Sequence, residues 1–371
     1  MPATCFLSYW IEWGWPLDSA DPGGRETARL ACPPVRPTLS FMTMIRFAPM
    51  LALVLLPAAL RANDSAAELA AGGLRLRAER RVAMVSEKLF ISKRQVRVDY
   101  AFVNVTRRAV RTEVAFPAPE SVLGPYYMDY SVRAVADFSL EVDGRAQPFR
   151  TRARAWARGR DVTALLKAAG VDIASFAGIR GSPTTGVVRS QLDRLPRGSL
   201  RRLRRAGLLK REEGRDIPDW GVRITYHWTQ TFPVGRTLRV SHAYTPVAGY
   251  QWVAGPAELE APGPRPWNHG LGPLCLAPLR GWLDAAIAAR PQDPAEAPAP
   301  LAVSWVRYIL ITARSWRPPI RDFQLEVAGE AGEGVAFCWD GPLQVLAPGH
   351  VRASARDFVP GRDLVICFVR P

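Results

Sequence analysis

Short segments in which apolar and polar residues alternate, each bounded by turn residues, constrain the fold of this chain more than any other feature. In residues 96–102 every second position is Val, Tyr or Phe, and this period of two is typical of a half-buried strand. Residues 110–116 and 138–142 predict two further strands, and Asp143-Gly144 after the second predicts a hairpin turn. Short strands separated by turns favour antiparallel sandwich packing over a parallel α/β sheet.

Residues 156–217 change in character and predict a helical insertion between strands. Residues 161–167 have the pattern of a capped helix that ends near Gly170, and residues 199–209 predict a second helix with leucines on one side. This second helix carries a dense run of arginines. We interpret the run as the solvated face of an amphipathic helix, and contact with a polyanion is the alternative.

Residues 222–231 and 237–245 have strand patterns and predict a β-hairpin around the intervening turn. In that register His227 lies directly opposite His242, with Cβ atoms about 5 Å apart. Two facing imidazoles could bind a metal ion, although a zinc site normally has three or four protein ligands and no third ligand is indicated. We keep His227 and His242 as candidate metal ligands, assign no metal, and favour a packed or hydrogen-bonded pair.

A Pro-rich segment with one helix, expected over residues 276–289, precedes strand-like stretches that continue to the C-terminus. The expected fold class is mainly β with a helical insertion (α+β), built from two antiparallel β-sandwich-like units. The expected regions are residues 1–43, a non-native N-terminal extension; 44–62, a signal peptide; 63–155, an N-terminal β-sandwich-like region; 156–217, the helical insertion; 218–254, a β-hairpin that returns to the first sheet; 255–300, the Pro-rich segment; and 301–371, a C-terminal β-rich region.

Residues 44–62 resemble a secretory signal peptide. Arg46 supplies the positive charge, residues 47–60 form an apolar stretch of 14, and Ala62 places a small residue before the cleavage point. About 20 apolar residues are needed to span a bilayer, and two prolines argue against the alternative of a buried core helix. We expect a periplasmic or secreted mature chain without a transmembrane span. Translation would start at Met42 or Met44, unless the leader is unusually long.

Three cysteines remain in the expected mature chain, residues 63–371. Thiols tend to pair in an oxidising compartment, and three cysteines allow three single bridges. We favour Cys275–Cys338, which would stabilise the fold by about 4 kcal/mol in the chain-entropy account. Cys367 lies in an apolar strand, where a buried free thiol is common.

The net charge of +15 is typical of proteins that bind nucleic acid. Only four of the 49 basic residues are lysines, however, and the arginines are spread along the chain, as GC-rich codon usage would produce. Because we also expect export, we expect no specific nucleic-acid partner. A basic surface would still attract an unknown envelope protein of opposite charge or an anionic polymer.

The sequence contains no G-x-S-x-G elbow, Walker loop, H-E-x-x-H or dinucleotide-binding motif, so we assign no catalytic residue and no cofactor. Tryptophans could form a ligand platform, although most should lie in the core because large aromatics bury much area. The tryptophans in question are Trp220, Trp228, Trp252, Trp267, Trp305, Trp316 and Trp339.

Several strings resemble the domain-of-unknown-function 4424 family. They are Ala62-Asn-Asp-Ser65, Glu87-Lys-Leu-Phe-Ile-Ser92, Val98-Asp-Tyr-Ala-Phe-Val-Asn104, Ala115-Phe-Pro-Ala-Pro119, Trp228-Thr-Gln-Thr-Phe-Pro233, His242-Ala-Tyr-Thr-Pro246 and Arg356-Asp-Phe-Val-Pro-Gly-Arg-Asp-Leu364. The resemblance covers the chain from about Ala62 onward. It implies an exported bacterial protein of a family without an established activity, so no catalytic residue can be carried over.

Two hypotheses for function follow. The first is a non-enzymatic envelope protein, a binding or interaction module built on β-sandwiches, since the chain combines an export signal with many strands and no catalytic motif. The alternative is a metal-assisted hydrolase that uses the pair His227 and His242.

Overall fold

The computed structural model describes residues 65–70, 73–119, 121–123, 135–173, 175, 191–212, 214–253, 255, 258, 273–288 and 300–370. All of these residues belong to one unit, Ala58–Pro371. The expected N-terminal extension (1–43) and signal peptide (44–62) lie outside the described residues.

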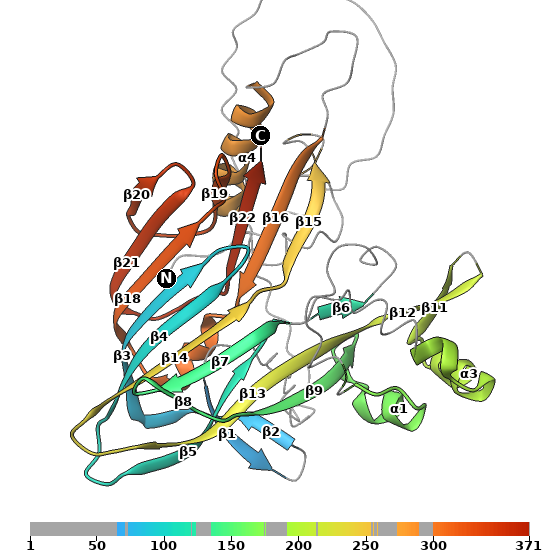
Figure 1. The fold of residues 1–371 in the computed structure, drawn as a ribbon, viewed down its shortest axis with the longest axis horizontal. Coiled ribbons are helices and arrows are strands. Elements are labelled where there is room, and N and C mark those ends of the chain that lie inside the picture. The colour runs from blue at the N-terminus through green and yellow to red at the C-terminus, as the bar shows by residue number, and fades with distance from the viewer. Residues whose placement is uncertain are drawn as a thin grey trace, which may run out of the picture. The chain divides into compact units, whose positions relative to one another are not determined.

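A nine-stranded sheet combines strands from both ends of the described chain (Figure 1). Its order is β20 (Leu343–Ala347), β21 (His350–Phe358), β18 (Ile320–Ala328), β3 (Glu79–Ile91), β4 (Val96–Asn104), β14 (Thr237–Thr245), β7 (Ala136–Val142) and β8 (Arg145–Ala146), with β17 (Trp316–Arg317) paired to β3. Neighbouring strands are antiparallel, except that β17 and β18 lie parallel to β3. The sheet therefore joins segments that the sequence analysis assigned to separate regions.

A seven-stranded sheet, antiparallel throughout, forms the second layer. Its order is β10 (Arg160–Asp161), β9 (Arg150–Ala157), β13 (Trp220–Phe232), β5 (Val110–Pro117), β1 (Ser65–Ala70) and β2 (Gly73–Leu76), with β6 (Ser121–Leu123) paired to β13. Along β13, Ile224, Tyr226 and Trp228 are buried in the main core. Because side chains alternate along a strand, Thr225, His227 and their neighbours at odd positions lie on the outer face.

The remaining elements are smaller. They are a four-stranded sheet in the order β15 (Ala248–Val253), β16 (Leu301–Tyr308), β22 (Leu364–Arg370) and β19 (Gly334–Ala336); a pair formed by β11 (Leu209–Glu212) and β12 (Arg215–Pro218); and the helices α1 (Thr163–Ala168), α3 (Arg197–Arg205), α4 (Pro273–Ala288) and η4 (Ile311–Ser315). Helix α4 packs Leu279 and Leu283 into a second core against the four-stranded sheet. Within the part of the chain that the structure describes, no helix is both long enough and apolar enough to cross a membrane.

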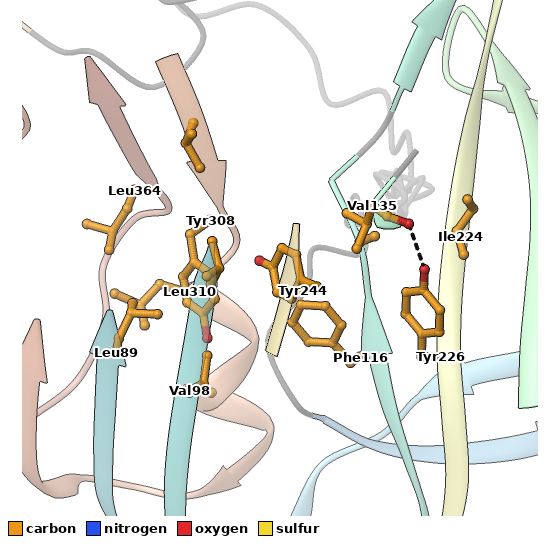
Figure 2. Close-up of a cluster of buried hydrophobic side chains, with 14 of the residues drawn as sticks. Leu89, Val98, Phe116, Val135, Ile224, Tyr226, Tyr244, Tyr308, Leu310 and Leu364 are labelled. Atoms are coloured by element: carbon orange, nitrogen blue, oxygen red, sulfur yellow. Dashed lines mark hydrogen bonds between the residues drawn. The ribbon is translucent and has the colours of Figure 1, made fainter. Parts of the chain in front are cut away.

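Aromatic side chains fill the space between the two large sheets. Phe138 of β7 stacks on Tyr226 of β13 with ring centroids 4.0 Å apart, and Phe116 of β5 lies 5.6 Å from Phe138. The Tyr226 hydroxyl donates a 3.1 Å hydrogen bond to the carbonyl of Val135, as Figure 2 shows. A buried tyrosine of this kind combines a large buried area with a satisfied polar group.

The expected fold class, mainly β within an α+β arrangement, is confirmed.

The hairpin predicted for residues 218–254 is wrong in its pairing. β13 pairs with β5, β6 and β9, whereas β14 pairs with β4 and β7 in the other sheet. The chain changes sheet after Phe232, whose carbonyl accepts a 3.0 Å hydrogen bond from the buried Asn104 side chain. Val234 then forms an isolated bridge with Asn104. A side chain from the end of β4 thus fixes a corner where local sequence indicates a simple turn.

Two local predictions are confirmed. Asp143 and Gly144 both have positive φ, 49° and 75°, and join β7 to β8 as a primed hairpin turn requires. The two predicted helices are present as α1 and α3, although the same stretch also contains β10, β11 and most of β12. In α3, Leu203 is buried, while Arg204 forms a 2.7 Å hydrogen bond with Asp216 of β12 and holds the pKa of that carboxyl below its usual value.

Candidate functional site

The two histidines proposed as a facing pair lie on different sheets and do not meet. His227 is paired with Ala115 and Arg150 within the seven-stranded sheet, and His242 with Val98 and Leu140 within the nine-stranded sheet. The predicted register is wrong because β13 and β14 diverge after residue 232.

His242 lies in the core between the sheets. Its ring centroid is 4.5 Å from that of Phe116 and 5.5 Å from those of Tyr100 and Phe138. Burial lowers the pKa of His242 to about 3, against the smaller opposing effect of Asp99. The imidazole is therefore neutral at physiological pH and serves as an aromatic core residue.

His227 lies on the outer face of the seven-stranded sheet. Its Nδ1 is 2.6 Å from Glu113 Oε1, and the Thr229 hydroxyl donates to Glu113 Oε2 at 2.8 Å. Burial raises the pKa of Glu113, but the hydrogen bonds from His227 and Thr229 outweigh it, and the net pKa lies below the usual value. Among the described residues, no group of three or more His, Cys, Asp or Glu could hold a metal ion. His227 and His242 therefore cannot act together as metal ligands of a hydrolase, because they lie in different sheets.

The cysteines lie near the four-stranded sheet. Cys338, just after β19, is buried in the second core with Leu279 and Leu283 of α4. Cys275 belongs to α4, but its side chain lies outside the described residues, so the bridge Cys275–Cys338 stays a prediction. Cys367 is a buried free thiol whose pKa is raised to about 12 by burial.

A cavity of about 670 Å³ lies at the end of the nine-stranded sheet, beside Cys338. It is bounded by β21, by residues 338–341 and by residues 358–364, which join β21 to β22. Its apolar lining includes Leu310, Trp339, Phe358, Val359 and Leu364; Figure 2 shows Leu310 and Leu364. We refer to this cavity as the aromatic pocket.

Two lining residues of the aromatic pocket, Trp339 and Phe358, form a set of three rings with the buried Phe323. Trp339 lies 5.7 Å from Phe323 and 5.6 Å from Phe358, and the two phenylalanines lie 4.5 Å apart. Phe323 is fully buried and anchors the set in the main core. Because Trp339 and Phe358 come from segments on either side of β20, the pocket depends on the fold of this sheet edge.

Gly341 allows the Trp339 indole to lie close to the backbone. A Cβ atom at Gly341 would be 2.9 Å from Trp339 Nε1, which is closer than real Cβ atoms approach other atoms. The indole N–H is buried and has no hydrogen-bond partner among the described residues. A buried donor without a partner costs about 1–3 kcal/mol.

The mouth of the aromatic pocket is polar. Arg362 Nη2 donates to Asp340 Oδ1 at 2.6 Å, and Arg362 Nη1 lies 3.6 Å from Cys338 Sγ. The Asp340 side chain is 72% exposed and that of Arg362 is 40% exposed. An ion pair this open to water contributes at most about 1 kcal/mol. Arg362 can therefore exchange Asp340 for another anion at little cost.

A carboxylate beside the mouth fixes the loop that carries Arg362. Asp363 Oδ1 accepts hydrogen bonds from the backbone N–H groups of Leu310, at 3.1 Å, and Ile311, at 3.2 Å. These contacts connect the loop before β22 to the start of η4. The pocket is thus built in advance of any ligand, with an apolar interior and a cation held at its edge.

Three residues of the pocket were not predicted as site residues from the sequence: Arg362, Phe358 and Val359. The signals were present, since all three residues lie in the string 356–364 that carries the family resemblance, and Trp339 was among the tryptophans considered as a platform. What the sequence lacked was the contact between residues 338–341 and residues 354–364, which only the fold brings together.

Residues 62–367 match the family described as Domain of unknown function (DUF4424), and the chain belongs to this family. No curated protein matches the sequence. A solved structure of a Legionella pneumophila protein, described as a "putative nutrient binding protein", is 15% identical over 78% of this chain and 68% of that chain, with a TM-score of 0.38. The M1 zinc metallopeptidase from Deinococcus radiodurans is 11% identical over 78% of this chain and 43% of that chain, with a TM-score of 0.26. Both TM-scores are below 0.5, so neither likeness supports an argument about fold or function.

Proposed function

We propose that this member of the DUF4424 family is an exported, non-enzymatic binding protein of the bacterial envelope and that its ligand occupies the aromatic pocket. The observation that carries the proposal is the combination of an apolar cavity of about 670 Å³ with a ring-lined wall and Arg362 at its mouth. Ligand sites are typically concave, mostly apolar and equipped with a few fixed polar groups.

The chemistry of the lining indicates the class of ligand. Leu310, Phe358 and Val359 favour an apolar or aromatic body, and Arg362 favours a carboxylate, sulfonate or phosphate at one end. The ligand anion would replace the exposed Asp340 as the partner of Arg362. A cavity of this volume accepts a molecule of ordinary metabolite size.

Export is part of the same proposal. The signal-like residues 44–62 support a mature chain that begins at Asn63 in the periplasm or outside the cell. An oxidising compartment would allow the bridge between Cys275 and Cys338 next to the pocket. The non-reduced intact mass of protein recovered from the envelope tests both points: we expect residues 63–371 less two hydrogens. A full-length chain, or a chain with all thiols reduced, would contradict them.

The binding test uses 1-anilinonaphthalene-8-sulfonate (ANS), which combines an aromatic body with one anionic group. We expect one saturable site on the chain of residues 63–371. Val359 is 49% exposed, so Val359→Glu should keep the fold while it places a like charge at the mouth and abolishes ANS binding. Arg362→Ala should weaken binding about tenfold.

Arg352→Ala is the matched control for the ANS test. Arg352 lies on β21, which ends just before Val359, its side chain is exposed to a similar extent as that of Arg362, and it pairs with Glu326 away from the aromatic pocket. We expect Arg352→Ala to bind ANS as the wild type does. Equal ANS binding by wild type and Val359→Glu would remove the assignment of the pocket.

A further inference from the structure

We propose that the outer face of the seven-stranded sheet is a second binding site, for an extended ligand that carries several phosphate or carboxylate groups. The site is an open cavity of about 880 Å³, formed by β9, by α1 and by His227 of β13; Figure 1 shows α1 beside β9. It shares no lining residue with the aromatic pocket. We refer to it as the basic groove.

A row of arginines follows β9 through the basic groove. Arg150, Arg152 and Arg154 occupy alternate positions and line the cavity together. Residues two apart on a strand are about 6.6 Å apart, so the row extends over about 13 Å. Arg150 is paired in register with His227, and Arg154 with Arg223, and residues directly opposite share a face of the sheet. The cations therefore lie side by side on one surface rather than on both.

The two ends of the row already have carboxylate partners. Arg150 Nη2 lies 3.0 Å from Glu113 Oε1, and Arg154 Nη1 lies 3.4 Å from Asp161 Oδ2. Glu113 also accepts hydrogen bonds from side chains of β13, so both of its oxygens are used within the sheet. These contacts engage the two end arginines, whereas the centre of the row is left to other partners.

Arg152 and Lys167 are the cations without partners. Within the described residues, neither forms a hydrogen bond or an ion pair, although both line the groove. Lys167 is held over the groove by α1, because the Thr163 hydroxyl one turn earlier accepts a 2.9 Å hydrogen bond from the backbone N–H of Ala155 on β9. Thr163 and Lys167 are four residues apart and share one face of the helix.

The balance of charge and the shape of the groove indicate the ligand. Four cations, Arg150, Arg152, Arg154 and Lys167, line the groove together with one carboxylate, Asp161. Guanidinium groups recognise phosphate and carboxylate oxygens in a bidentate manner. A row with regular spacing suits repeated anionic groups on one chain better than a single small ion. The groove thus fits an acidic polymer with regularly spaced anionic groups.

Short-chain inorganic polyphosphate with a fluorescent label is the probe, and fluorescence anisotropy at several salt concentrations is the readout. The test variant is Arg152→Gln with Lys167→Gln, which removes the two uncommitted cations. The matched control is Arg317→Gln with Arg321→Gln. These arginines are exposed on β17 and β18 and have no ion pair within the described part of the chain, so both doubles change the net charge equally.

We expect the wild type to bind polyphosphate in a salt-dependent manner. The double variant in the groove should bind about tenfold more weakly and with a smaller salt dependence. The control double variant should bind within about twofold of the wild type. No binding by the wild type, or an equal loss in both doubles, would overturn the proposal. Equally tight binding of single phosphate ions would overturn its extended-ligand part. Since Arg152 and Lys167 lie outside the aromatic pocket, ANS binding should be unchanged in the groove double, which separates this test from that of the proposed function.

Discussion

Replacing His242 by phenylalanine should make the stability of this protein less sensitive to acid. In the folded protein the pKa of His242 is about 3 because the ring is buried among aromatic side chains, whereas an unfolded chain has a histidine pKa of about 6.5. As the pH falls through 6.5 toward 3, the unfolded state takes up a proton that the folded state does not. The stability that the neutral ring contributes is therefore complete above pH 6.5 and is lost progressively below it.

The size of the effect follows from the two pKa values. Each pH unit below the unfolded pKa costs about 1.4 kcal/mol, so at pH 5 the loss is about 2 kcal/mol, against about 0.2 kcal/mol at pH 7. Carboxylates with lowered pKa values, such as Glu113 and Glu326, titrate mainly below this range and in both proteins. Their contributions to the pH dependence of stability therefore cancel when the variant is compared with the wild type.

Urea unfolding at pH 7 and pH 5 measures this difference. We expect the free energy of unfolding of the wild type to fall by about 2 kcal/mol more than that of His242→Phe. Tyr244→Phe is the matched control, because Tyr244 lies in the same core, 6.4 Å from His242, and does not titrate in this range. An equal fall in the wild type and in His242→Phe would refute the reasoning, whatever the absolute stability of each variant.

Three further predictions concern the corner, the aromatic pocket and the free thiol. Asn104→Ala removes the amide that donates to the carbonyls of Arg108 and Phe232, so chemical denaturation should show a loss of about 2–4 kcal/mol, and a loss below 1 kcal/mol would contradict its role. Gly341→Ala should displace the Trp339 indole and change its fluorescence, and an unchanged spectrum would refute the close approach. Cys367 should resist iodoacetamide in the folded protein and react fully in urea, since it is buried with a raised pKa; rapid labelling of the folded protein would contradict its burial.

Local features of this fold could be predicted from the sequence because they depend on neighbouring residues. Alternation in residues 96–102 located β4, and Asp143-Gly144 located a turn whose positive φ values these residues tolerate. Sheet order could not be predicted in the same way. The parallel pairing of β18 with β3 joins residues such as Asp322 and Ser86, and no local pattern records a contact between segments so far apart.

Because local patterns do not record contacts between distant segments, the predicted histidine pair was wrong and the aromatic pocket was missed. The pairing of His227 with His242 assumed that a short connection makes a hairpin, but the Asn104 side chain directs the two strands into different sheets. The aromatic pocket was missed because Trp339 and Arg362 meet only through tertiary structure. Their residue types were visible, whereas their proximity was not.

A crystal structure of residues 63–371 with bound ANS tests the central claim most directly. We predict that the ring system of ANS lies in the aromatic pocket against Trp339 and Phe358, with the sulfonate within hydrogen-bond distance of Arg362 in place of Asp340. ANS bound elsewhere on the protein, with the pocket unchanged and the contact between Arg362 and Asp340 intact, would contradict it.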